Sequence, residues 1–101
     1  MPEGSAPEYR LSPAAIRDLT EIWRYTSKEW GKEQANRYTL ALQAMCAKLA
    51  EAPQQGQSCA HIRPGYRRRG TEHHVIYYRV TDYGIAVVRI LHQRMDAGRR
   101  M

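Results

Sequence analysis

The sequence has few of the features that mark secreted or membrane proteins. Of its 101 residues only two are cysteines, Cys46 and Cys59, and they form no CxxC pair. Two cysteines cannot build the disulfide framework of a small secreted domain, so we expect both to be reduced. No apolar run approaches the roughly 18–20 residues of a membrane-spanning helix. The first nine residues also lack the basic and apolar pattern of a signal peptide. We therefore expect a soluble, cytoplasmic protein without membrane contacts.

Motifs for nucleotide or metal chemistry are missing as well. The sequence contains no P-loop and no GxGxxG, and no Ser–His–Asp arrangement can be read from it. His73 and His74 are neighbours on an expected strand, so their side chains point to opposite faces and cannot hold one metal ion together. We therefore expect neither a metal nor a cofactor.

The length predicts one small domain, because single domains usually contain about 100–150 residues. A hydrophobic content of 43% is too high for a disordered chain. We expect a flexible tail over residues 1–7, a domain over residues 8–97 and a basic tail over residues 98–101.

Positive charge is concentrated in one part of the chain. The formal net charge is +6, and residues 1–59 contribute none of it because they hold seven basic and seven acidic residues. Residues 60–101 hold nine arginines, no lysine and only three acidic residues. Arginine suits bidentate contacts to carboxylate or phosphate. This half of the chain is therefore expected to present a basic surface to an acidic protein segment or to nucleic acid.

The first half of the sequence predicts a short strand and a helical hairpin. Residues 8–11 alternate like a strand, and Ser12 followed by Pro13 has the pattern of a helix N-terminus. Gly31 ends this helix, and a second one is expected over residues 32–52, up to Pro53. The apolar positions of the second helix form a narrow seam that suits packing against the first.

After a polar loop over residues 53–58, the apolar period changes to two. Strands are expected over residues 65–69, 72–80 and 85–92, with a hairpin turn at residues 81–84 in which Gly84 takes a positive φ. Strict alternation places Ile76, Tyr78 and Val80 with Ala86, Val88 and Ile90 on the face that meets the helices. It places Val75, Tyr77 and Arg79 with Val87, Arg89 and Leu91 on an open face that awaits a partner.

The end of the chain carries the remaining candidate chemistry. His92 close to several arginines could cleave RNA by acid–base catalysis, with arginine stabilising the phosphorane charge. The same residues could form a partner-binding surface or a solvated basic tail. Residue types alone leave these three interpretations open.

The order of motifs along the chain resembles the ParE-type toxins of the RelE/ParE superfamily, the toxic components of bacterial type II toxin–antitoxin modules. The resemblance covers about residues 8–97 and rests on these segments: Leu11-Ser12-Pro13-Ala14-Ala15, Asp18-Leu19-x-x-Ile22-Trp23, Ala35-x-x-Tyr38, Leu49-Ala50-x-x-Pro53, Arg63-Pro64-Gly65-Tyr66-Arg67, His74-x-Ile76-x-Tyr78-Arg79 and Ile90-Leu91-His92-x-Arg94-Met95-Asp96. It implies an α+β fold, in which an N-terminal strand and a helical hairpin are followed by a three-stranded antiparallel meander that completes one curved sheet.

The resemblance also implies a function. A ParE-type toxin poisons DNA gyrase, is neutralised by a ParD-type antitoxin, and reaches operator DNA only through that antitoxin. It would then be a protein inhibitor and not an enzyme. Relatives that cut mRNA on the ribosome carry an arginine at the start of the third strand and a tyrosine near the C-terminus. Here His74 takes the first position and no tyrosine follows Tyr83, which favours the gyrase branch. An unusual RNA-cleaving pair of His92 and Arg94, or a non-toxic binding module, are the alternatives.

Two sets of site residues follow from this combination. The set expected to contact gyrase or its DNA consists of His92, Arg94, Met95, Asp96, Arg99 and Arg100. The set expected to bind the antitoxin consists of Tyr66, Arg68, Tyr77, Arg79, Val87, Arg89 and Leu91. Deletion of residues 97–101 is expected to remove toxicity and to spare the fold, because no core residue would be lost.

Overall fold

The structure is a computed structural model and describes residues 6–101, so the tail expected over residues 1–7 lies outside the described residues up to residue 5. The elements, in chain order, are β1 (Glu8–Leu11), α1 (Pro13–Trp30), α2 (Lys32–Glu51), the 3-10 turn η1 (Pro53–Gln55), β2 (Gln57–Ser58), β3 (Tyr66–Gly70), β4 (His74–Val80), β5 (Gly84–His92) and α3 (Ala97–Arg100).

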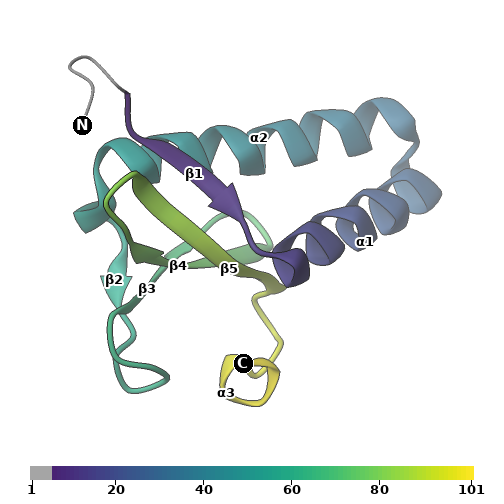
Figure 1. Ribbon diagram of the computed structural model, residues 1–101. Coiled ribbons are helices and arrows are strands. Elements are labelled where there is room, and N and C mark those ends of the chain that lie inside the picture. Colours follow the sequence, from purple (N-terminus) through teal and green to yellow (C-terminus); the bar gives the residue numbers. More distant parts are fainter. Residues whose placement is uncertain (1–5) are drawn as a thin grey trace.

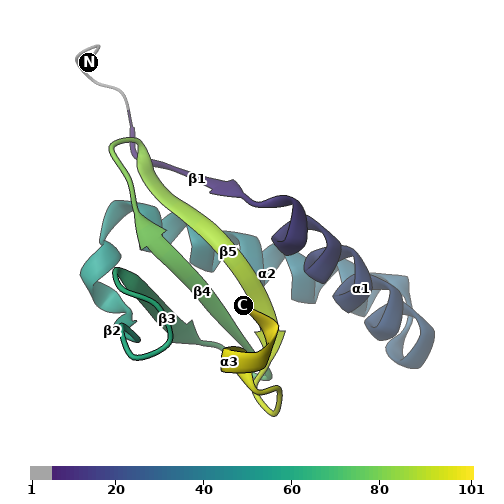
Figure 2. The same cartoon turned by 60° about the horizontal axis from the view of Figure 1, so that its bottom comes forward.

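The strands form one five-stranded sheet in the order β1-β5-β4-β3-β2. β1 pairs in parallel with the first half of β5, from Glu8 opposite Gly84 to Leu11 opposite Val87, and the other pairs are antiparallel. Helices α1 and α2 lie together on one side of this sheet, and α3 lies on the other (Figures 1 and 2). The expected fold class is confirmed, while the short strand β2 and the helix α3 were not predicted.

The helical hairpin begins and turns where the sequence indicates. The Ser12 hydroxyl caps α1 by accepting a hydrogen bond of 3.0 Å from the backbone N–H of Ala15, and Pro13 opens the helix. Gly31 separates the two helices at a φ of +94°, which favours glycine. The hairpin packs its apolar seam, including Ile22, Leu42 and Leu49, onto the sheet.

A β-bulge in the β4–β5 pair changes which side chains of β5 meet the helices. Tyr77 pairs with Arg89 and Tyr78 pairs with Val87, so Val88 is the extra residue of the bulge. An extra residue reverses the alternation on one side of it. Val87 is therefore fully buried in the helix-facing core, and Val88 packs on the opposite side. The prediction that Val87 lies on the open face is wrong, as is the prediction that Val88 meets the helices.

The face of the sheet opposite the hairpin of α1 and α2 has a small core of its own. It is called the helix-free face below because the two long helices do not cover it. Buried Cys59, Tyr77, Leu91 and Ala97 form this core, with half-buried residues of the loop before β3 and of the C-terminus packed around them. In Figure 2, α3 lies in front of β4 and β5 on this face. Because Ala97 is only 7% exposed, the prediction that removing residues 97–101 costs no core residue is wrong.

The two cysteines are free and buried in different places, Cys46 among the helix-facing residues and Cys59 on the helix-free face. Burial raises the pKa of the Cys46 thiol to about 12, so this thiol stays protonated at neutral pH.

Candidate functional site

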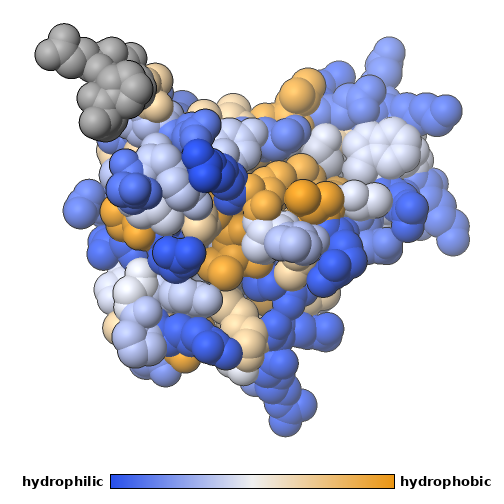
Figure 3. Space-filling model, in the orientation of Figure 1, coloured by the Kyte–Doolittle hydropathy of each residue, from blue (hydrophilic) through white to orange (hydrophobic). Residues whose placement is uncertain are grey.

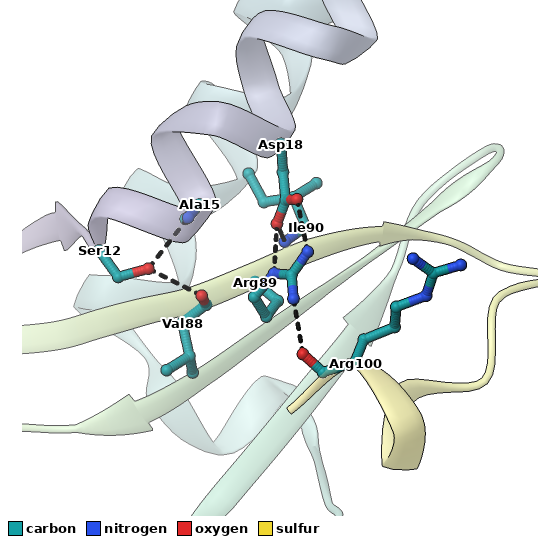
Figure 4. A network of polar contacts seen from close by, with 7 residues as sticks. All are labelled: Ser12, Ala15, Asp18, Val88, Arg89, Ile90 and Arg100. Carbon is teal, nitrogen blue, oxygen red and sulfur yellow. Dashed lines mark hydrogen bonds and ion pairs between the residues drawn. The ribbon is translucent and has the colours of Figure 1, made fainter.

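An ion pair between Asp18 and Arg89 ties three segments of the chain together (Figure 4). The Asp18 carboxylate accepts two hydrogen bonds of 2.8 Å from the Arg89 guanidinium, and it also accepts one of 2.9 Å from the backbone N–H of Ile90. A third guanidinium N–H of Arg89 donates to the backbone carbonyl of Arg100, at 2.6 Å. The pair therefore joins α1 and β5, and it holds the end of α3 against them.

The pair arises because β1 is shorter than β5. β1 ends opposite Val87, and the remaining edge of β5 would be left without hydrogen-bond partners. The start of α1 supplies them: the Ser12 hydroxyl donates to the Val88 carbonyl, and the Asp18 carboxylate accepts from Ile90. The side chains of Asp18 and Arg89 are 13% and 22% exposed, so the pair is mostly shielded from water.

The Asp18 hydrogen bonds raise the pKa of Arg89, and three of the five N–H groups of its guanidinium already donate hydrogen bonds within the chain. Arg89 belongs to the set expected to bind the antitoxin. Within the chain, its guanidinium already binds the carboxylate of Asp18. The sequence indicated only a helix for the segment that contains Asp18. The acidic residue six positions after the N-cap Ser12 was the one available signal.

Val87, of the set expected to bind the antitoxin, lies in the helix-facing core, and the remaining residues of that set fall into two groups. Tyr77 and Leu91 are 4% and 2% exposed beneath the chain's own C-terminal segment. Arg68 and Arg79 are exposed, and Tyr66 is half-buried beside them. The strand register puts Arg68 opposite Tyr77 and Arg79 opposite Tyr66, so these side chains share the helix-free face. Their role in antitoxin binding stays a prediction.

The set expected to contact gyrase forms a compact turn and helix. The backbone N–H of Arg94 donates to Nδ1 of His92 at 3.1 Å, and Asp96 caps α3 by accepting from the N–H of Gly98 at 3.0 Å. Arg94, Met95, Arg99 and Arg100 are exposed. Residues 97–100, expected in part as a loose basic tail, form α3.

A small aromatic cluster lies where β4 begins and β5 ends. The Tyr38 hydroxyl and His74 Nδ1 share a hydrogen bond of 2.6 Å, and the His74 ring meets the His92 ring edge-on at 5.4 Å between centroids. Burial, followed by the nearby His92 and His73, lowers the pKa of His74 to about 4. His74 is therefore neutral at pH 7 and serves as a packing and hydrogen-bonding group.

An apolar groove on the helical hairpin was not foreseen from the sequence. It runs along α1 beside β1 and α2, and its walls are Leu11, Ile16, Leu19, Thr20, Trp23, Thr39 and Gln43. Ile16 is an apolar residue of α1 and is nevertheless 52% exposed. Figure 3 shows hydrophobic side chains gathered between β1 and the start of α1, with hydrophilic ones around them. An apolar groove rimmed by polar groups is typical of a protein-docking site.

Within residues 6–101 no group of three or more His, Cys, Asp or Glu side chains is placed to hold a metal ion. Over the same residues, none of the helices combines the length and apolar character needed to cross a membrane.

The fold and these surfaces define a small basic α+β domain with a helical hairpin on one face of a mixed sheet. A family model described as "ParE toxin of type II toxin-antitoxin system, parDE" matches residues 9–97. The chain belongs to this family of ParE toxins.

Curated relatives and a solved structure agree with the family. Toxin ParE1 of Mycobacterium tuberculosis is 48% identical over 94 residues, covering 92% of this chain and 96% of the relative. Toxin ParE1 of Caulobacter vibrioides is 45% identical over 89 residues, covering 88% and 92%. A chain of the structure described as "Chromosomal ParDE TA system from P. aeruginosa" superposes with a TM-score of 0.74 at 21% identity, covering 88% of this chain and 98% of that one, and this likeness supports the fold.

Replacing Asp18 by alanine is expected to lower the free energy of unfolding by about 3 kcal/mol, because a mostly buried Arg89 charge and the Ile90 N–H lose their partner. Urea unfolding followed by circular dichroism measures the change. The matched control is Glu21→Ala, also on α1, whose pair with Arg24 is 71% and 68% exposed. It should cost less than about 1 kcal/mol. Equal losses for the two variants would contradict a structural role of the Asp18 pair.

Stability is expected to fall as the pH is lowered from about 6.5 towards 4, because His74 has an ordinary pKa of 6.5 when unfolded and about 4 when folded. Between these pH values the unfolded chain binds more protons than the folded one, so acid favours unfolding. Above pH 6.5 His74 is neutral in both states, and the protein keeps the stability that it loses on acidification. Urea midpoints measured across this range should vary less with pH in His74→Gln. The exposed His61 provides the control variant His61→Gln, which should keep the slope of the unsubstituted protein.

Proposed function

We propose that this ParE-family protein poisons DNA gyrase in the bacterial cytoplasm, and that a ParD-type antitoxin neutralises it by direct binding. In this proposal it acts as a protein inhibitor that traps the broken-DNA intermediate, and not as an enzyme. The observation that carries the proposal is family membership over residues 9–97. Two departures of the sequence from the mRNA-cleaving relatives support it: His74 replaces their strand arginine, and no tyrosine follows Tyr83.

Two histidines near the end of β5 use Nδ1 in local hydrogen bonds. His92 Nδ1 accepts a hydrogen bond from the Arg94 backbone, and His74 Nδ1 shares one with Tyr38. Each ring therefore already has one nitrogen engaged in holding the turn or the strand start.

The segment proposed to meet gyrase is the turn and helix after β5. Its exposed side chains, Arg94, Met95 and Arg99, extend from a backbone that is held by the Asp96 cap and by the Arg89 bond to the Arg100 carbonyl. A pre-ordered segment binds without the entropy cost of ordering a loose tail. Point substitutions of the exposed arginines test this segment better than its deletion, which would also remove buried Ala97.

Purified gyrase, ATP and supercoiled plasmid are expected to yield linear DNA when this protein is added. Arg94→Glu combined with Arg99→Glu should reduce the linear product at least tenfold, because it reverses two exposed charges of the segment proposed to contact gyrase. The control is Arg24→Glu with Arg37→Glu, which reverses two exposed arginines on the helical hairpin. Folded protein that gives no linear DNA, but fragments mRNA in a translation extract, would overturn the proposal in favour of a ribonuclease.

The proposed antitoxin site is the apolar groove of the hairpin. Leu11, Ile16 and Leu19 leave apolar surface open there, and Trp23 Nε1 donates to Asn36 Oδ1 at 2.8 Å, which fixes one wall. The toxin of a ParDE module has an antitoxin as its partner, and an amphipathic antitoxin segment would cover such a groove by its apolar side.

Ile16→Glu is expected to weaken the affinity for the cognate antitoxin at least tenfold in isothermal titration calorimetry, because it places a charge on the apolar wall of the groove. Tyr25→Glu serves as the control, since Tyr25 is 66% exposed on the same helix and does not line the groove. Full affinity of the Ile16 variant would place the antitoxin elsewhere, with the exposed residues of the helix-free face as the next surface to substitute.

A further inference from the structure

A set of exposed arginines surrounds the helix-free face, and we call it the arginine rim: Arg68, Arg79, Arg94, Arg99 and Arg100. Arg68 and Arg79 belong to neighbouring strands, β3 and β4, and the register places them diagonally across the pair. Such diagonal neighbours are about 7–8 Å apart. The other three arginines lie on the turn and helix that follow β5, and α3 packs on the same face through Ala97.

The arginine rim is left without close carboxylate partners inside the described chain. Of its members only Arg99 faces one there, Asp96 at 3.8 Å, and both side chains are largely exposed. By contrast Arg10, Arg24 and Arg89 pair with carboxylates at 3.0 Å or less. Figure 4 shows the Arg100 guanidinium pointing away from the Asp18–Arg89 pair, which uses only the Arg100 carbonyl. The rim therefore keeps its charge available to an external anion.

The surface inside the rim determines what kind of anion fits. Its apolar residues are already covered, since Tyr77 and Leu91 are 4% and 2% exposed beneath α3 and the loop before β3. A protein segment normally gains affinity from apolar anchors that fill pockets, whereas a nucleic-acid backbone offers charge and needs no such pocket. What this face presents is charge, in arginines that suit phosphate oxygens.

We propose that the arginine rim binds the phosphate backbone of duplex DNA. As diagonal neighbours on β3 and β4, Arg68 and Arg79 are close enough together to contact neighbouring phosphates of one DNA strand. Within residues 6–101, the helix on this face is the four-residue α3, which is too short to read the major groove, so the contact is to the backbone and not to particular bases. The biological role of this binding rests on the proposed gyrase function: the arginine rim would bring the toxin to the DNA segment that gyrase holds.

The test measures DNA binding by the purified full chain without gyrase, so its outcome is independent of the poisoning assay. A fluorescein-labelled duplex of about 20 base pairs and arbitrary sequence is titrated with the protein at several salt concentrations. The expected result is an affinity that falls linearly with salt on logarithmic axes. Arg68→Glu with Arg79→Glu should weaken binding at least tenfold at low salt and reduce the steepness of that line by about two.

The matched control is again Arg24→Glu with Arg37→Glu, which changes the net charge equally but lies on the hairpin. It should leave the salt slope unchanged, and circular dichroism checks that each variant is folded. If the glutamate variant is unfolded, Arg68→Gln with Arg79→Gln decides the matter, again by a smaller slope.

Three outcomes would overturn the inference. The unsubstituted protein could fail to bind the duplex at low salt, or the rim and hairpin variants could lose affinity and slope equally, which would indicate net charge alone. In the third, the rim variant keeps its DNA affinity and loses affinity for the antitoxin, so that the rim is a protein-docking surface.

Discussion

The hydrogen-bonded pair of Asp18 and Arg89 is the contact on which the arrangement of this ParE-family fold depends. β1 covers only half of β5, and the pair completes the uncovered edge by accepting the Ile90 N–H while neutralising an otherwise isolated guanidinium. The same guanidinium reaches the Arg100 carbonyl and keeps α3 on the sheet. One side-chain pair thus sets the position of the helical hairpin, the end of the sheet and the C-terminal segment relative to one another.

Features that depend on local chemistry could be predicted from the sequence. Ser12 with Pro13, Gly31 and Pro53 mark the helix ends, and Gly84 has its predicted positive φ. The bulge at Val88 could not be predicted, because strict alternation reads equally well in either register until cross-strand packing selects one. The docking of α3 was missed for a similar reason. Ala97 and Met101 are unremarkable in a basic segment, and only the folded sheet shows the apolar surface that they cover.

What the sequence could not show about the candidate surfaces has one physical origin. The sequence located the arginines correctly but could not show which of them the chain itself satisfies. Arg89 has its carboxylate in Asp18, which is 71 residues away, whereas Arg68 and Arg79 remain exposed. The apolar groove around Ile16 could not be predicted either. The apolar stripe of α1 is wider than the surface that packs against it, so one side of the stripe stays exposed. The protein consequently separates its surfaces by chemistry, with an apolar groove on the helical side and arginines on the other.

The parallel pairing of β1 with β5 has a consequence for the order in which the molecule can be assembled. The first strand pairs with residues 84–87, so most of the chain must leave the ribosome before that strand can be placed. Contacts between such distant positions raise the contact order and slow folding. The hairpin of α1 and α2 can form early from local contacts, while its groove acquires Leu11 as a wall only when the sheet closes. In the newly synthesised chain the two helices can therefore form before the apolar groove and the sheet are complete.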